Sequence, residues 1–171
     1  MLTFSEQEFK KRYERAYELM KRGNIDALMV TEKSNYCYFT PHRSIGWVTK
    51  TRPIILILPY ESDPVLIVHE WEIGNAKANC PWIKDIRTWI DLPFSISPVL
   101  EVFQDLKLTT GRIGVELGNE QRLNLSPMDF LKLKNLGHSL RRFIVTLAFF
   151  QRSSEKIDFG KIALSHSGFG H

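Results

Sequence analysis

Cysteine and long apolar runs are both scarce in this sequence. Cys37 and Cys80 are the only cysteines among 171 residues, too few for a disulfide framework or a cysteine-rich zinc site. The longest apolar runs, Ile54–Leu58 and Phe143–Phe150, fall far short of the ~20 residues that cross a bilayer. Residues 1–22 are highly charged and lack the apolar segment of a signal peptide. We therefore expect a cytoplasmic protein with reduced cysteines and no membrane partner.

A strong excess of charge of one sign is also missing. The chain has 23 Lys and Arg against 19 Asp and Glu, a net charge of +4. Residues 1–137 hold 18 basic and 17 acidic side chains, so most of the excess lies in residues 138–171. A nucleic-acid-binding protein normally carries a clustered basic face on its folded domain. We therefore expect no nucleic-acid partner.

Motifs for hydrolytic catalysis are incomplete. His69-Glu70 begins like the helical zinc motif with two histidines, but Ile73 stands where the second histidine is required. We interpret His69 as the last residue of a strand. There is no G-x-S-x-G nucleophile motif, and Cys37 lies among aromatic residues, which favours a role in the core. The sequence predicts no catalytic residue and no metal ligand.

Helical and strand patterns alternate along the chain. Ser5 and Glu8 form a capping box, flanked by Phe4 and Phe9 at the staple positions, and Gly23 is expected as the left-handed residue that ends this first helix. A short helix or a turn is predicted at 32–39. Further helices are predicted at 70–79, 97–108 and 126–135, the last two with serine N-caps at Ser97 and Ser126. Strands are predicted at 26–30, 53–58, 65–68, 83–89, 112–116 and 142–145.

The order of these elements indicates the fold class. Alternating strands and helices are typical of an α/β domain, but the runs 53–58 and 65–68, joined by a turn-forming segment, predict a hairpin. A hairpin places antiparallel strands in the sheet. We therefore predict an α/β fold with a mixed central sheet of about six strands flanked by helices.

The segment 41–52 is the strongest candidate for a binding site. It is irregular, lies between two clearly predicted elements, and combines His42, Arg43 and Trp47 with further cations. Loops on rigid scaffolds often carry function, and Arg and Trp dominate binding hot spots. A solvated loop with a packed tryptophan explains the same residues. A groove for single-stranded nucleic acid would also use basic and aromatic groups, but no matching basic sheet face accompanies this segment.

Several segments together resemble the N-terminal domain of the creatinase/prolidase family, the Xaa-Pro peptidases and their relatives. The most specific stretch is GNIDALMVTEKSNYCYFT, at residues 23–40, and Ile113-Gly-Val-Glu116 is similar to the family's fifth-strand motif. Pro41 stands where the family usually has glycine, so the backbone of that turn is expected to differ. The resemblance covers residues 5–137, and residues 138–171 are predicted to be a linker-like or non-native tail.

The resemblance implies a ribonuclease H-like motif and a non-catalytic role. In this family a separate C-terminal domain holds two divalent metals, and we expect that domain to be absent from this chain, which would then bind no cofactor and have no peptidase activity alone. The N-terminal domain supports oligomerisation and walls the active site of a metal-dependent hydrolase. This implies a homodimer, the catalytic domain as partner, and His42, Arg43 and Trp47 as residues facing a neighbouring active site. The alternative is a free-standing module for a small ligand or a protein, because fold does not fix function.

Overall fold

The computed structural model describes residues 4–49, 52–90, 94–117, 121–135 and 139–142. Its elements follow in this order: α1 (Glu6–Gly23), β1 (Ala27–Val30), α2 (Lys33–Phe39), the 3-10 helix η1 (Ile45–Val48), β2 (Ile55–Pro59), β3 (Val65–His69), the 3-10 helix η2 (Glu70–Glu72), α3 (Ile73–Asn79), β4 (Asp85–Trp89), α4 (Ser97–Asp105), β5 (Arg112–Val115), α5 (Pro127–Asn135) and β6 (Ser139–Arg142).

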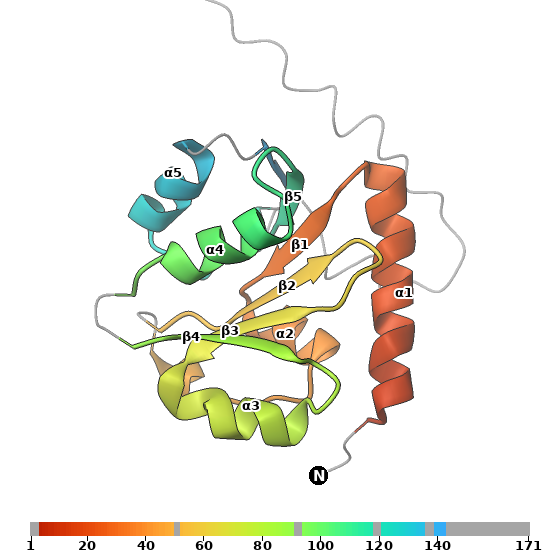
Figure 1. Ribbon diagram of the computed structural model, residues 1–171, viewed down its shortest axis with the longest axis vertical. Coiled ribbons are helices and arrows are strands. Elements are labelled where there is room, and N and C mark those ends of the chain that lie inside the picture. The colour runs from red at the N-terminus through yellow and green to blue at the C-terminus, as the bar shows by residue number, and fades with distance from the viewer. Residues whose placement is uncertain (1–3, 50–51, 91–93, 118–120, 136–138, 143–171) are drawn as a thin grey trace, which may run out of the picture.

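The six strands form one mixed sheet in the order β4-β3-β2-β1-β5-β6 (Figure 1). β2 is antiparallel to both of its neighbours, β1 and β3. The pairs β3/β4, β1/β5 and β5/β6 are parallel. The predicted α/β class, the hairpin and the mixed sheet are therefore confirmed.

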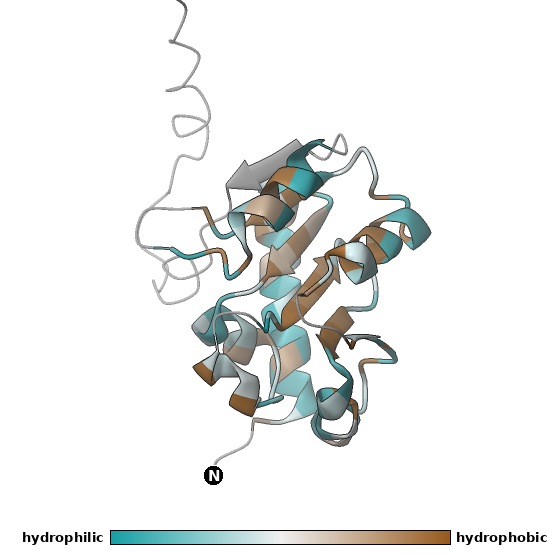
Figure 2. Ribbon diagram, turned by 90° about the vertical axis from the view of Figure 1, so that its left-hand side faces the viewer, coloured by the Kyte–Doolittle hydropathy of each residue, from teal (hydrophilic) through white to brown (hydrophobic). Residues whose placement is uncertain are grey.

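Helices cover both faces of the sheet, so each face has its own hydrophobic core. On one face α1, α2 and α3 pack against alternate strand residues such as Leu56 and Leu58. On the other face α4 and α5 pack against Ile55 and Ile57. All five residues of β2 are buried, as expected for a central strand covered on both sides. Figure 2 shows the hydrophobic colour concentrated on the central strands.

The ends of α1 agree in part with the prediction. The Ser5 side chain accepts a hydrogen bond from the Glu8 amide, so the predicted N-cap is confirmed. The left-handed residue at the other end is Asn24, with φ of 52°, and not Gly23, which is the last helical residue. The correction follows from the closing bonds, because the Asn24 and Ile25 amides donate to Lys21 O and Met20 O, which places the turn one residue later.

Two other element ends also differ from the prediction. Ser97 is the first residue of α4, and its N-cap is Ile96, because Ser97 bonds back to the Ser95 hydroxyl instead of capping. The last described strand is Ser139–Arg142, so it begins three residues before the predicted start at Arg142, and residues 143–145 of the predicted strand lie outside the described residues. Within the described part of the chain, no helix is both long and apolar enough to cross a membrane. Cys80 is buried and Cys37 half-buried, and both thiols are free.

Candidate functional site

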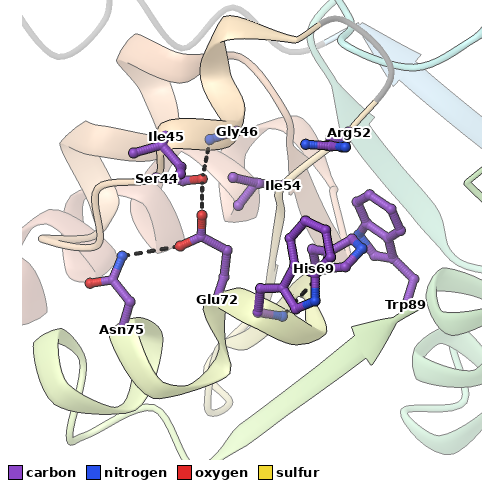
Figure 3. Close-up of a pocket in the computed structure, with 10 residues that line it drawn as sticks. Ser44, Ile45, Gly46, Arg52, Ile54, His69, Glu72, Asn75 and Trp89 are labelled. Atoms are coloured by element: carbon purple, nitrogen blue, oxygen red, sulfur yellow. Dashed lines mark hydrogen bonds between the residues drawn. The ribbon is translucent and has the colours of Figure 1, made fainter. Parts of the chain in front are cut away.

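A cavity of about 310 Å³ lies beyond the carboxyl ends of the parallel strands β3 and β4 (Figure 3). The strand-end residues His69 and Trp89 are partners in the register and both line it. In open α/β sheets, ligands characteristically bind outside the carboxyl ends of parallel strands. The remaining lining residues come from the segment between α2 and β2 and from the start of α3: Ser44, Ile45, Gly46, Arg52, Ile54, Trp71, Glu72 and Asn75.

Glu72 organises one side of this cavity. Its carboxylate accepts hydrogen bonds from the Ser44 hydroxyl at 2.5 Å, from Asn75 Nδ2 at 3.0 Å and from His42 Nε2 at 3.2 Å. Ser44 Oγ also accepts from the Gly46 amide at the start of η1 (Figure 3). One carboxylate therefore fixes the segment 42–46 to the start of α3.

The buried partner of Glu72 is His42, which also contacts α2. His42 is fully buried, and its Nδ1 lies 2.8 Å from the Tyr36 hydroxyl. Burial lowers the pKa of His42 below its ordinary value, although Glu72 opposes this shift. Burial alone would raise the pKa of Glu72, but the hydrogen bonds from Ser44, Asn75 and His42 together lower it. At neutral pH the pair is therefore a neutral imidazole donating from Nε2 to a carboxylate, with Nδ1 left to accept from Tyr36.

The opposite side of the cavity is aromatic and cationic. The His69 ring lies 4.5 Å from the ring centres of both Trp71 and Trp89. The Arg52 guanidinium lies over Trp71, 5.6 Å from the ring centre. Arg52 Nε is shielded from water, and within the described part of the chain it has no acceptor and Arg52 forms no ion pair. A cation and two indoles therefore border a space that is open to a ligand.

The structure places the three predicted site residues in different environments. His42 is buried and connects Tyr36 with Glu72. Arg43 is exposed, and its guanidinium donates to the carbonyls of Thr40, His42 and Cys37 at the end of α2. Trp47 packs edge-on against Tyr36, at 5.3 Å between ring centres, and its buried indole nitrogen has no hydrogen-bond partner among the described residues. None of the three lines the cavity, and their predicted binding role stays a prediction.

Other residues form the cavity and were not predicted from the sequence. Arg52 lay in the predicted segment but was not selected, and His69 was predicted only as a strand-end residue, which is its position. Trp71 and Glu72 lie two and three residues after His69, so the rule that α/β sites gather after strand ends could have found them. The pairing of Glu72 with Ser44 joins residues 28 positions apart, and no local sequence pattern reports such a contact.

No metal centre is visible in the described part of the chain. Groups of three or more His, Cys, Asp or Glu side chains that could hold a metal ion do not occur among those residues. His42 and Glu72 are one imidazole and one carboxylate, and both are already satisfied by protein partners. The prediction that this chain holds no metal remains untested by this observation.

Comparison with known proteins identifies the family. The family model described as Creatinase/Prolidase N-terminal domain matches residues 12–147. A search of curated proteins found no match. Among solved structures, the dipeptidase PepE from Mycobacterium ulcerans superposes with a TM-score of 0.64 at 18% identity, over 82% of this chain and 36% of that one.

Two streptococcal structures match over most of their own length. A proline dipeptidase from Streptococcus agalactiae gives a TM-score of 0.63 at 15% identity, covering 84% of this chain and 99% of that one. The N-terminal domain of an X-Pro dipeptidase from Streptococcus pyogenes gives 0.59 at 15% identity, covering 77% and 92%. This chain spans about a third of the M. ulcerans protein and of a Pyrococcus horikoshii dipeptidase. At these identities the superpositions show the shared fold, and the match of the family model over most of the sequence shows that the chain belongs to the creatinase/prolidase N-terminal domain family.

Proposed function

We propose that this chain acts as the non-catalytic N-terminal domain of a metal-dependent Xaa-Pro peptidase or creatinase-like hydrolase. In this role the surface around the cavity docks against a catalytic domain and walls its active site. Support comes from the family, whose solved relatives include dipeptidases acting on Xaa-Pro substrates by their names. The proposal assigns positioning and assembly to this chain and leaves metal-dependent hydrolysis to the partner domain.

The observation that carries the proposal is an exposed apolar surface at the mouth of the cavity. Ile45 is 88% exposed and Trp71 is 74% exposed, and both line the cavity. Val48, on the same 3-10 helix as Ile45, is 90% exposed. Clustered exposed apolar side chains mark interaction sites in soluble proteins. Because Glu72 fixes the backbone beneath them, these side chains are presented on a rigid base and bind without a large ordering cost.

The first test measures the activity of the chain by itself. The purified 171-residue protein is assayed against Xaa-Pro dipeptides with Mn²⁺, Co²⁺ or Zn²⁺, and its bound metal is quantified. We expect no turnover and no stoichiometric metal. Metal-dependent hydrolysis that copurifies with the chain and survives further purification would contradict the proposal.

The second test examines the apolar surface. In the isolated chain this surface is expected to cover itself by self-association, giving the homodimer that the family resemblance implies. Sedimentation velocity should show that Ile45→Asp with Val48→Asp shifts the protein toward monomer. Met128→Asp is the matched control, because Met128 is 65% exposed on α5, away from the cavity. Equal dissociation of both variants, or a monomeric parent at every concentration, would count against this surface.

A second function is favoured by the cavity itself. The half-open cavity of about 310 Å³, bordered by Arg52, is the size of a small-ligand site, which ranges from roughly 300 to 1,000 Å³. A free-standing binding module would use this space without a catalytic partner. The two functions differ at Val48, which is exposed and does not line the cavity, whereas Ile45 belongs to both the cavity and the docking surface.

A further inference from the structure

A groove of about 480 Å³ lies beside α1, at the opposite end of β3 and β4 from the cavity. One wall is α1, and the other is formed by the residues that lead into β3 and β4. Because these strands are parallel, with Val65 opposite Asp85, their leading residues lie side by side. Figure 1 shows the turn between β2 and β3 next to α1, where the Tyr17 hydroxyl donates to the Ser62 carbonyl at 2.9 Å.

Aromatic side chains form the rigid part of this groove. Trp82 stacks on Phe9, with 5.6 Å between ring centres, and its indole N–H donates to the Tyr13 hydroxyl at 3.3 Å. The Tyr13 hydroxyl donates in turn to the Phe39 carbonyl. Tyr17 is held by its bond to the opposite wall. These rings are fixed by contacts within the protein, so an apolar body can pack on them without a large ordering cost.

The groove carries an excess of one negative charge. Three carboxylates and two ammonium groups line it: Glu6, Glu14 and Asp63 with Lys10 and Lys84. Glu6 and Lys10 form an ion pair at 2.6 Å. Among the described residues, Glu14, Asp63 and Lys84 take part in no ion pair. The groove therefore has two carboxylates to offer to a cation.

These two carboxylates lie near Tyr17. Glu14 precedes Tyr17 by three residues on α1, so both side chains share one face of the helix. The pKa of Tyr17 is raised to about 12, first by burial and then by the negative charges of Asp63 and Glu61. A cation beside Tyr17 thus meets carboxylates from both walls. Lys84 opposes it from the wall of Asp63, which favours a ligand with only one positive charge.

We propose that this groove binds a small organic cation that has one ammonium group on an aromatic or other flat apolar body. The ammonium lies between Glu14 and Asp63, and the body packs against Tyr17 and Trp82, whose rings also attract a cation. The site is complete within this chain. It shares no residue with the cavity or with the docking role of Ile45 and Val48, so each proposal can fail without the other.

The test titrates the full chain in solution with phenethylamine, a monocation with an aromatic body at neutral pH. The chain has four tryptophans, so a ¹H–¹⁵N correlation spectrum shows few indole N–H peaks, which single Trp→Phe variants assign. We expect the Trp82 peak to shift saturably, with a dissociation constant of roughly millimolar order for so small a ligand. The Trp71 and Trp89 peaks should stay in place, because both residues line the cavity at the other end of β3 and β4.

Three matched ligands identify what the groove recognises. 2-Phenylethanol has nearly the same body without the charge, phenylacetate carries the opposite charge, and ethylamine is an ammonium without the aromatic body. Each should bind more weakly than phenethylamine. Added salt should also weaken the binding of phenethylamine, because Glu14 and Asp63 are both exposed.

Four variants test the charges. Glu14→Gln and Asp63→Asn each remove one carboxylate and should each weaken phenethylamine binding about threefold, as expected for an exposed charge pair. Lys84→Gln removes the opposing cation and should strengthen binding about twofold. Glu101→Gln is the control, because Glu101 is exposed on α4, which packs on the other face of the sheet, and this variant should bind like the parent chain. Thermal unfolding of each variant verifies that it is folded.

Several results would overturn the site. Equal shifts with 2-phenylethanol would mean an apolar groove without charge recognition, and equal shifts with ethylamine would mean a general cation site. Unchanged binding by both Glu14→Gln and Asp63→Asn would remove the carboxylates from the site. An absence of any saturable shift at Trp82, up to the solubility limit of phenethylamine, would remove the site altogether.

Discussion

His42 and Glu72 show how a pair of side chains fixes the segment that presents the exposed apolar residues. The imidazole has no contact with solvent, and both of its nitrogens are used, one with Tyr36 of α2 and one with Glu72 before α3. Removing one partner of such a buried network leaves the other unsatisfied, which costs more than the bond itself contributes. His42, which was predicted as a binding residue, therefore has a structural role: it connects α2 with the start of α3.

Replacement of His42 should change the stability of the domain in a pH-dependent way. Because burial lowers the pKa of His42 in the folded state, the unfolded state binds more protons just below the ordinary value of 6.5. The contribution of His42 to the free energy of unfolding therefore decreases as the pH falls from 7.5 toward 5.5. His42→Gln should lower the free energy of unfolding by about 1–3 kcal/mol at pH 7.5 through the unsatisfied partners. This difference should shrink toward pH 5.5, because the variant has no imidazole to protonate.

Urea unfolding of the parent and variant chains at several pH values measures this effect. Tyr36→Phe is the matched variant, since it removes one partner of His42 and keeps the imidazole buried. It should destabilise the chain and retain the pH dependence. A constant difference between His42→Gln and the parent from pH 7.5 to 5.5 would show that His42 does not titrate in this way.

At the scale of elements, the end of α1 offers a test of the corrected cap. Asn24 has φ of 52°, in the left-handed region where a β-carbon is unfavourable and Asn and Gly are best tolerated. Asn24→Ala should reduce the free energy of unfolding by about 1 kcal/mol. Asn24→Gly should be neutral or slightly stabilising, because glycine adopts this conformation without strain. Equal destabilisation by both variants in urea titrations would mean that the Asn24 side chain, and not the backbone conformation, ends the helix.

The hydrogen bonds of Glu116, which connect the end of β5 with the segment between β1 and α2, show which features can be predicted from the sequence. The motif Ile113-Gly-Val-Glu116 was recognised, and the structure supplies its physical reason. The buried Glu116 carboxylate accepts from Asn35, from the Thr31 amide and hydroxyl, and from the Glu32 amide. Burial raises the pKa of Glu116, while these four donors oppose the rise. A family pattern can report such a residue, but its partners lie more than 80 positions away and are not evident from the local sequence.

Local signals predicted the elements better than they predicted the site. Apolar runs and caps such as Ser5 and Ser126 act over a few residues, and the structure confirms both caps. The cavity, by contrast, joins Ser44 and Arg52 to Trp71 and Trp89, which meet only once the sheet has formed. The cations of segment 41–52 led to the prediction of a binding site there. Which of these cations lines the cavity depends on where β3 and β4 end, and this is not evident from the local sequence.

At the scale of the whole molecule, one sheet separates two cores. Residues of β2 alternate between them, with Leu56 facing α1 to α3 and Ile57 facing α4 and α5. β2 also bonds to β1 on one side and β3 on the other. Neither core can lose its packing without disturbing the strand that the other core requires, so the domain should unfold as one cooperative unit.

Leu56→Ala and Ile57→Ala test this coupling, because both residues are fully buried but belong to opposite cores. Each should lower the free energy of unfolding by about 2–5 kcal/mol, from the lost burial and the remaining cavity. Urea titrations followed by circular dichroism and by tryptophan fluorescence should coincide, with the denaturant slope unchanged in both variants. Met128→Ala, at an exposed position on α5, is the control and should stay within about 0.5 kcal/mol of the parent. If Ile57→Ala separated the two transitions, the cores would be independent, and the segment around the cavity would keep its structure after α4 and α5 had unfolded.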